Sequence, residues 1–118
     1  MAKILIVDDS LMMRSVIKNY LKDRDFEFVE AQNGQEAFDK YKEHKPDLVF
    51  MDIIMPDIDG IQGSKLIKEF DSYAKIVVCS SVDEEGVNKD LATIGVVDRI
   101  TKPFKQEEII PMVEKYIK

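Results

Sequence analysis

The sequence has a single cysteine and no long apolar run. Only Cys79 is present among the 118 residues, so no disulfide can form within the chain, which fits a reducing compartment. The apolar stretch at residues 4–7 is cut off by two aspartates and is too short for a signal peptide. No apolar run approaches the roughly 20 residues that are needed to span a bilayer. We therefore expect a cytoplasmic protein that does not insert into membranes.

Positive charge is also in short supply. Lys and Arg number 17 against 23 Asp and Glu, which gives a net charge of -6. Nucleic acids and anionic membranes bind positive surfaces, so this balance argues against nucleic-acid binding. The chain does have 45% hydrophobic and 34% charged residues, which is ordinary for a soluble globular protein. Its length is enough for one domain with a hydrophobic core and leaves no room for a second domain, so we expect a single domain over residues 1–118.

Short apolar blocks alternate with amphipathic segments along the chain. The blocks are continuous and rich in branched residues, as in strands buried on both faces, and the other segments carry apolar residues at helical spacing. The predicted strands are residues 4–7, 26–31, 48–51, 76–79 and 96–100. The predicted helices are residues 11–21, 61–70, 83–94 and 109–117, and one that includes 37–41 and ends before Pro46.

Five such strand–helix units predict an α/β protein with a parallel sheet and helices on both faces. The expected architecture is a doubly wound (βα)5 flavodoxin-like fold with a five-stranded parallel sheet. A TIM barrel would need eight units and about twice the length. We borrow the strand order 2-1-3-4-5 from known flavodoxin-like sheets. The strand at 26–31 contains Glu27 and Glu30 and is expected nearer an edge.

Polar side chains stand where four of the predicted strands end. The first strand is followed by Asp8 and Asp9, the third by Asp52, the fourth by Ser80 and the fifth by Lys102. Open parallel sheets bind ligands at the carboxyl ends of their strands. In the order 2-1-3-4-5 these four strands are neighbours. We therefore expect these side chains to converge on one cleft.

Three carboxylates in one cleft repel one another. Two unit charges roughly 4 Å apart cost about 4 kcal/mol at an effective dielectric constant near 20, so a proton or a cation must relieve the repulsion. Oxygen ligands with positions left for water suit Mg²⁺ or Mn²⁺. A metal-bound carboxylate that faces a lysine can attack phosphorus. Lys102 and the metal would then neutralise the phosphoryl oxygens, and the hydroxyl of Ser80 would donate to one of them.

Four segments, ILIVDDS, LVFMDIIMPDIDG, VVCSS and ITKPF, resemble in order and spacing the receiver domain of two-component response regulators. The resemblance covers essentially the whole chain, and DDSLMMRSVI is similar to single-domain chemotaxis regulators of the CheY-like type. It implies a signalling switch rather than an enzyme, with Asp52 as the phospho-acceptor. A sensor histidine kinase would be the phosphodonor, and a downstream protein target would receive the signal, most simply at the surface formed by the last helices and strand.

The resemblance also assigns the metal ligands. Asp9 would bind Mg²⁺ directly and Asp8 mostly through water, while Asp52 and the backbone carbonyl of Ile54 complete the set. In the family, the positions two residues after the acceptor and two after the switch Ser/Thr flank the path of the hydrolytic water. Here these positions are Ile54 and Val82, which cannot orient water, so we predict a long-lived phosphoryl-aspartate.

The remaining roles concern the switch. Ser80 stands at the family's switch Ser/Thr, and the side chain of Lys102 would contact the phosphate. The resemblance also implies that the peptide bond between Lys102 and Pro103 is cis. The family usually has Tyr or Phe three residues before the lysine, but this chain has Arg99. A guanidinium resists burial unless it is paired, so we predict that Arg99 stays at the surface and contacts a partner directly.

Several alternatives stay open at this point. Asp8 and Asp9 could simply cap the first helix, because Asp is a favourable cap. A phosphorelay intermediate would pass the phosphoryl group on to a histidine phosphotransfer protein. A small Mg-dependent aspartyl phosphatase would use the same aspartate for turnover. The sequence is equally compatible with a monomer and with a weak dimer.

Overall fold

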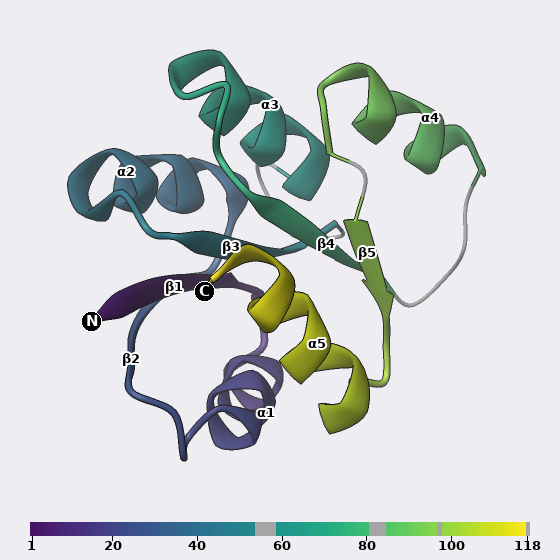
Figure 1. Cartoon of the computed structure of the whole chain (residues 1–118). Helices are drawn as coiled ribbons and strands as arrows, with labels where there is room; N and C mark the ends of the chain where they lie inside the picture. The colour runs from purple at the N-terminus through teal and green to yellow at the C-terminus, as the bar shows by residue number, and fades with distance from the viewer. Residues whose placement is uncertain (54–58, 81–84, 97, 118) are drawn as a thin grey trace.

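Strands and helices alternate through residues 1–53, 59–80, 85–96 and 98–117, which are the residues that the computed structural model describes (Figure 1). The strands are β1 (Ala2–Val7), β2 (Phe26–Ala31), β3 (Leu48–Asp52), β4 (Ile76–Ser80) and β5 (Asp98–Thr101). The helices are α1 (Leu11–Tyr20), α2 (Gly34–His44), α3 (Gly60–Phe70), α4 (Glu85–Thr93) and α5 (Gln106–Tyr116). All neighbouring strands are parallel, in the order β2-β1-β3-β4-β5. The predicted fold, the borrowed strand order and the edge position of β2 are thereby confirmed.

Some element boundaries differ from those predicted. The last helix starts at Gln106 rather than 109, because a polar first turn with Glu107 and Glu108 precedes its apolar positions. These acidic residues suit the positive end of the helix dipole. The last strand is shifted to Asp98–Thr101, and the predicted helix start at residues 83–84 lies outside the described residues. None of the helices in the described parts is long and apolar enough to cross a membrane.

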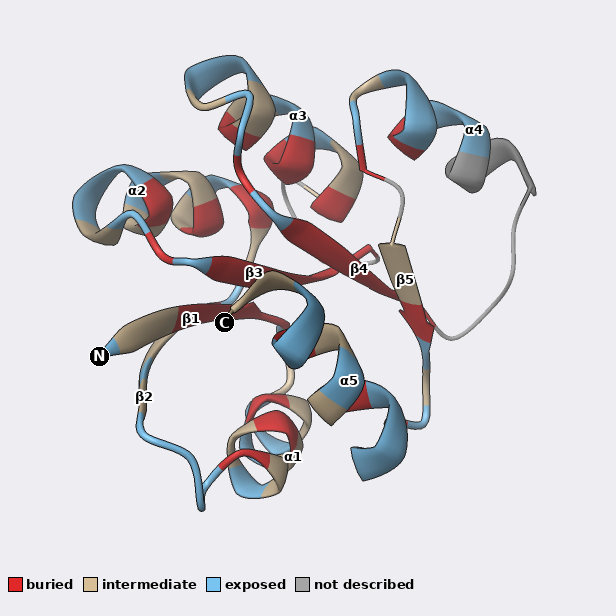
Figure 2. Cartoon of the chain, in the orientation of Figure 1, coloured by how far each residue is buried: buried red, intermediate tan, exposed pale blue. Residues whose placement is uncertain are grey.

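Side chains that alternate along the strands fill two hydrophobic cores, one on each face of the sheet. Helices α2, α3 and α4 cover one face, and α1 and α5 cover the other (Figure 1). The first core holds Leu5, Val7, Val49 and Met51 with helix residues such as Tyr41, Ile67 and Leu91; the second holds Ile4, Ile6 and Phe50 with Ile17, Ile109 and Val113. The central strands β3 and β4 are buried along their whole length (Figure 2).

The first turn of α1 carries apolar residues that stay exposed. Leu11 and Met12 open the helix predicted for residues 11–21, and they are 65% and 70% exposed. They belong to the first turn of α1, while the part that packs on the sheet begins at Met13 and continues through Val16. Hydropathy alone does not tell which apolar residues of a helix become buried. The same helix buries Arg14 instead.

Candidate functional site

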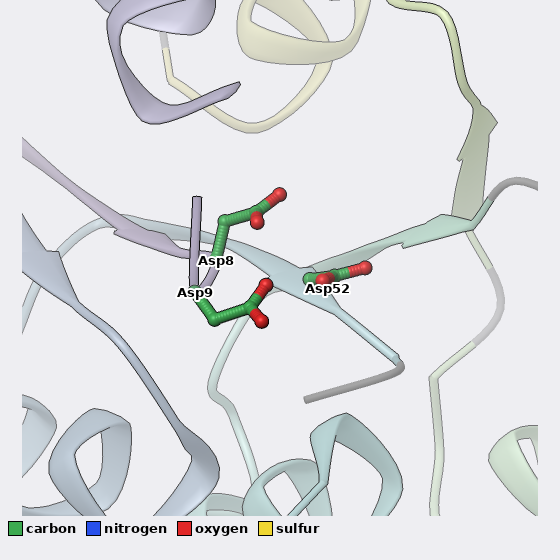
Figure 3. A group of neighbouring side chains, drawn as sticks. All are labelled: Asp8, Asp9 and Asp52. Atoms are coloured by element: carbon green, nitrogen blue, oxygen red, sulfur yellow. The ribbon is translucent and has the colours of Figure 1, made fainter. Parts of the chain in front are cut away.

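Three carboxylates gather at the carboxyl edge of the sheet. Asp8 and Asp9 directly follow β1, and Asp52 is the last residue of the neighbouring strand β3 (Figure 3). Carboxylate oxygens of the three residues lie within 4.8 Å of one another. Asp8 and Asp52 are buried, whereas Asp9 is exposed. The predicted convergence of these side chains is therefore present.

Lys102 joins two of these carboxylates. Its Nζ lies 2.9 Å from Asp8 Oδ2 and 3.2 Å from Asp52 Oδ1. The residue follows β5, and its backbone N–H donates to the carbonyl of Ser80 over 2.7 Å, which ties it to the end of β4. The peptide bond between Lys102 and Pro103 is cis, as predicted. One ammonium group thus pairs with two of the three carboxylates.

Asp8 is held by its backbone and by its side chain. Its N–H donates to the Ala31 carbonyl at the end of β2, over 3.1 Å. Its Oδ1 accepts a hydrogen bond of 2.9 Å from the N–H of Ser10. The N-cap of α1 is Ser10, whose hydroxyl accepts from the Met13 N–H. The alternative that Asp8 or Asp9 is the helix cap is therefore wrong, since the next residue fills that role.

The electrostatics of the cluster favour a bound cation. Burial raises the pKa of Asp52, and the charges of Asp8 and Asp9 raise it further, although Lys102 opposes them. Burial would lower the pKa of Lys102, but its hydrogen bond to Asp8 and the charges of Asp52 and Asp8 outweigh burial and raise it. Lys102 therefore stays charged and still leaves negative charge in excess. A donor set of carboxylate oxygens with one exposed member fits a hard divalent ion such as Mg²⁺.

A glycine at the start of α3 sets the backbone position of Asp52. A Cβ atom at Gly60 would lie 1.9 Å from the backbone oxygen of Asp52, so only glycine allows this approach. The Gly60 N–H donates to the Ile53 carbonyl over 2.9 Å, and the Ile53 N–H donates to the Cys79 carbonyl over 3.2 Å. The end of β3, which carries Asp52, is thus held by α3 on one side and by β4 on the other.

The other predicted site residues fall in different places. Ser80 is buried at the end of β4, one residue beyond Cys79, the register partner of Asp52, so it belongs to the same edge. Arg99 lies within β5 opposite Val78, and it is half-buried rather than fully at the surface. The predicted ligand at residue 54 and the residue at position 82 lie outside the described residues.

Arg14 is the residue that the sequence reasoning missed. It is 7% exposed, and its Nη1 donates to the backbone oxygen of Asp8 over 2.6 Å. Its Nε donates to Glu30 Oε1 over 2.9 Å. An arginine between apolar helix positions, together with a glutamate in an otherwise apolar strand, is the sequence signal that points to such a pair.

Comparison with known proteins places this geometry in a family. The model of the response regulator receiver domain matches residues 4–114. A chemotaxis protein CheY of Listeria monocytogenes is 45% identical over 119 residues and covers 100% of both chains. A CheY of Bacillus subtilis is 46% identical over 114 residues, or 96% of this chain and 95% of its own.

Solved structures that resemble this chain also include those of CheY proteins. The structure of a CheX–CheY–BeF3–Mg complex from Borrelia burgdorferi has a chain 31% identical, with a TM-score of 0.90, covering 99% of this chain and 90% of that one. The CheY4 protein of Vibrio cholerae has a TM-score of 0.91 over 99% of both chains, at 24% identity, which shows the fold alone.

Proposed function

The chain belongs to the response regulator receiver family, with full-length CheY-type relatives, and on that premise we propose that it is a chemotaxis signalling switch phosphorylated on Asp52. The observation that carries the proposal is the placement of Lys102 between Asp8 and Asp52 at the carboxyl edge of the sheet. This arrangement has a nucleophile, a cation beside it and two further carboxylates. We take residues 1–118 as one receiver domain and its place of action as the cytoplasm.

In the proposed reaction the Asp52 carboxylate is the nucleophile. One carboxylate oxygen forms a bond to phosphorus while the phosphorus–nitrogen bond of a phosphohistidine breaks, and the imidazole leaves with the electron pair. The Lys102 ammonium, 3.2 Å from Asp52 Oδ1, stabilises the negative charge of the phosphoryl oxygens. The Ser80 hydroxyl donates to one of these oxygens. The product is an acyl phosphate that stores the signal.

Asp8, Asp9 and Asp52 would hold Mg²⁺ or Mn²⁺, together with the backbone carbonyl of Ile54. The ion, when bound, supplies positive charge that offsets the charge of the phosphoryl oxygens. Asp9 is exposed, which suits direct binding, whereas the Oδ2 of Asp8 already accepts from Lys102, which suits binding through water. These contacts support the division of roles between the two aspartates.

The proposed phosphodonor is a sensor histidine kinase. Leu11 and Met12 are large apolar side chains, 65% and 70% exposed, and they follow the acidic pair by two and three residues. They would contact the kinase beside its phosphohistidine. We expect Met12→Ser to slow phosphotransfer from the kinase but not from a small donor such as acetyl phosphate. Equal slowing with both donors would contradict a docking role.

The signal is proposed to leave through protein–protein contact with a downstream target. Arg99 replaces the usual aromatic residue on β5, so the inward and outward movement of an aromatic ring cannot serve as the readout, and Arg99 would contact the target itself. Target affinity should fall in Arg99→Ala with a beryllofluoride mimic of phosphate. No change with or without the mimic would exclude this role.

The phosphoryl-aspartate is proposed to be long-lived, because Ile54 and Val82 cannot orient water. Ile54→Asn should speed dephosphorylation, measured as loss of label after the donor is removed. An unchanged rate would contradict this explanation of the lifetime.

The central experiment is labelling of the purified protein by acetyl phosphate with Mg²⁺, followed by intact mass. We expect one phosphoryl group per chain, sensitive to hydroxylamine, absent in Asp52→Ala and retained in the control Asp98→Asn. Continued turnover of a phosphomonoester would favour the aspartyl phosphatase instead. Transfer from phospho-Asp52 to a histidine phosphotransfer protein would favour a relay intermediate.

A further inference from the structure

We propose that Arg14 is a positioning residue that fixes the peptide bond between Asp8 and Asp9 so that both carboxylates are ready for a divalent ion. This inference rests on the metal site in the proposed function. The observation behind it is a buried contact between α1 and the end of β1. Nη1 of Arg14, on α1, donates to the backbone oxygen of Asp8 over 2.6 Å.

The Asp8 carbonyl belongs to the peptide plane that joins Asp8 to Asp9. This plane is rigid, so a hydrogen bond to its oxygen orients both Cα atoms that flank it. The Asp8 N–H on the preceding peptide is already held by the Ala31 carbonyl. With both groups held, Asp8 can turn neither of its peptide planes freely. The exposed side chain of Asp9 then starts from a fixed Cα, which reduces the ordering required when an ion binds.

The guanidinium is itself fixed by an ion-pair network. Its Nε donates to Glu30 Oε1 over 2.9 Å, and Lys18 Nζ lies 3.0 Å from Glu30 Oε2, so both carboxylate oxygens of Glu30 are engaged. Burial would raise the pKa of Glu30, but the hydrogen bonds from Lys18 and Arg14 outweigh burial and lower it. The network therefore joins α1 to the edge strand β2 and to the end of β1.

Glu30 also limits the electrostatic effect of Arg14. A buried cation beside a metal site would repel the incoming ion, and the carboxylate of Glu30, which Arg14 shares with Lys18, reduces that repulsion. The contribution of Arg14 is therefore geometric. A lysine at this position would keep the charge but lose the planar fork that reaches the Asp8 oxygen and Glu30 at the same time.

The first test measures Mg²⁺ affinity of the unphosphorylated full chain by isothermal titration calorimetry. Outer residues that orient metal ligands typically contribute 10–100-fold to affinity, so we expect Arg14→Met to weaken Mg²⁺ binding about tenfold and Arg14→Lys to weaken it less. The matched control is Lys115→Met, which breaks a 3.0 Å ion pair to Asp98 in another part of the molecule and should leave the affinity unchanged. A lowered melting temperature with wild-type affinity in Arg14→Met would show a purely structural role and overturn the proposal.

The second test needs no metal and separates this inference from the proposed function. Backbone amide resonances and amide exchange are measured for Asp9 and Ser10 in metal-free protein. We expect Arg14→Met to shift both resonances and speed both exchanges, with Lys115→Met as the unchanged control. Unchanged amides would overturn the proposal even if wild type binds Mg²⁺. If wild type binds no Mg²⁺, the proposed metal site is contradicted. The amide data for Asp9 and Ser10 then still test whether Arg14 positions the peptide bond. Glu30→Gln carries both tests if Arg14→Met does not fold.

Discussion

The two ends of α3 lie at opposite edges of the sheet and are built in opposite ways. At its start, Gly60 presses against the backbone of Asp52, beside a cluster of like charges. After its end, Asp71 accepts a 2.7 Å hydrogen bond from the hydroxyl of Tyr41, and the rings of Tyr41 and Phe70 pack edge to face at 6.4 Å. The carboxylates near the start repel one another, whereas the polar groups near the end form a hydrogen bond.

The difference shows that the region at the start of α3 is less favourable for folding than the region at its end. Like charges held together cost stability, and natural structures retain such sites where an ion or a reaction uses them. Complementary aromatic and hydrogen-bonded contacts each contribute about 1 kcal/mol, and they lie at the edge away from the carboxylates. Substitutions at the start of α3 should therefore affect metal binding and stability together, and those at its end should affect stability alone.

The largest effect is expected for Gly60→Ala. The new Cβ would overlap the Asp52 oxygen, so the helix start or the end of β3 must move. Overpacking of this kind costs about 3 kcal/mol, measured by urea denaturation, and should also weaken Mg²⁺ binding. Gln62→Ala, at an exposed position of the same helix turn, is the control and should change little. Equal stability of the two variants would refute the close approach.

The next largest effect is expected for Asp9→Asn, and its sign depends on the metal. Without Mg²⁺ the variant should gain about 1 kcal/mol of stability, because an exposed charge within 4.8 Å of two others is removed. With Mg²⁺ at about 100 times its Kd, wild type should gain roughly 2.7 kcal/mol and the variant much less. Thermal denaturation with and without Mg²⁺ measures both. The comparison breaks down if Asp71→Asn, at the other end of α3, shows the same dependence on metal.

The fold was predictable because its signals are local. Continuous branched runs indicate buried strands, helical spacing indicates the helices, and the rule that ligands bind at carboxyl strand ends brought Asp8, Asp52 and Lys102 together in advance. These inferences need only the order of elements. The cis peptide bond before Pro103 was expected from the family resemblance and not from the residues themselves.

The contacts of Arg14 were not predicted from the sequence, because they depend on how α1 is rotated against the sheet. The contact of Arg14 with the Asp8 carbonyl spans six residues and a turn, and its pairing with Glu30 spans 16. A periodic pattern shows which residues share a helix face. It does not show that Leu11 and Met12, at the start of α1, are exposed.

A smaller effect is expected for Tyr41→Phe, which removes the hydrogen bond to Asp71 and should cost about 1 kcal/mol at neutral pH. That hydrogen bond lowers the pKa of Asp71 in the folded chain. Its contribution is complete above the unfolded-state pKa near 3.9, and it is lost as the pH falls through the lower folded pKa. Urea denaturation at neutral pH and near pH 3 should therefore show the difference from wild type shrinking in acid. A constant difference would mean that the contribution of the Tyr41 hydroxyl does not depend on the charge of Asp71.

The smallest effect is expected midway along α3, at Ser64. Its hydroxyl is fully buried and has no hydrogen-bond partner among the described residues. An unsatisfied hydroxyl destabilises the fold, and Ala is the better helix former, so Ser64→Ala should raise stability by about 0.5 kcal/mol despite the small void that it leaves. Because Ser64 belongs to neither end, the gain should be the same with and without Mg²⁺, and Ser72→Ala, an exposed position, serves as the control. A gain that depends on the metal would mean that the strain of the carboxylate edge reaches the middle of the helix, and that the two ends of α3 are not independent.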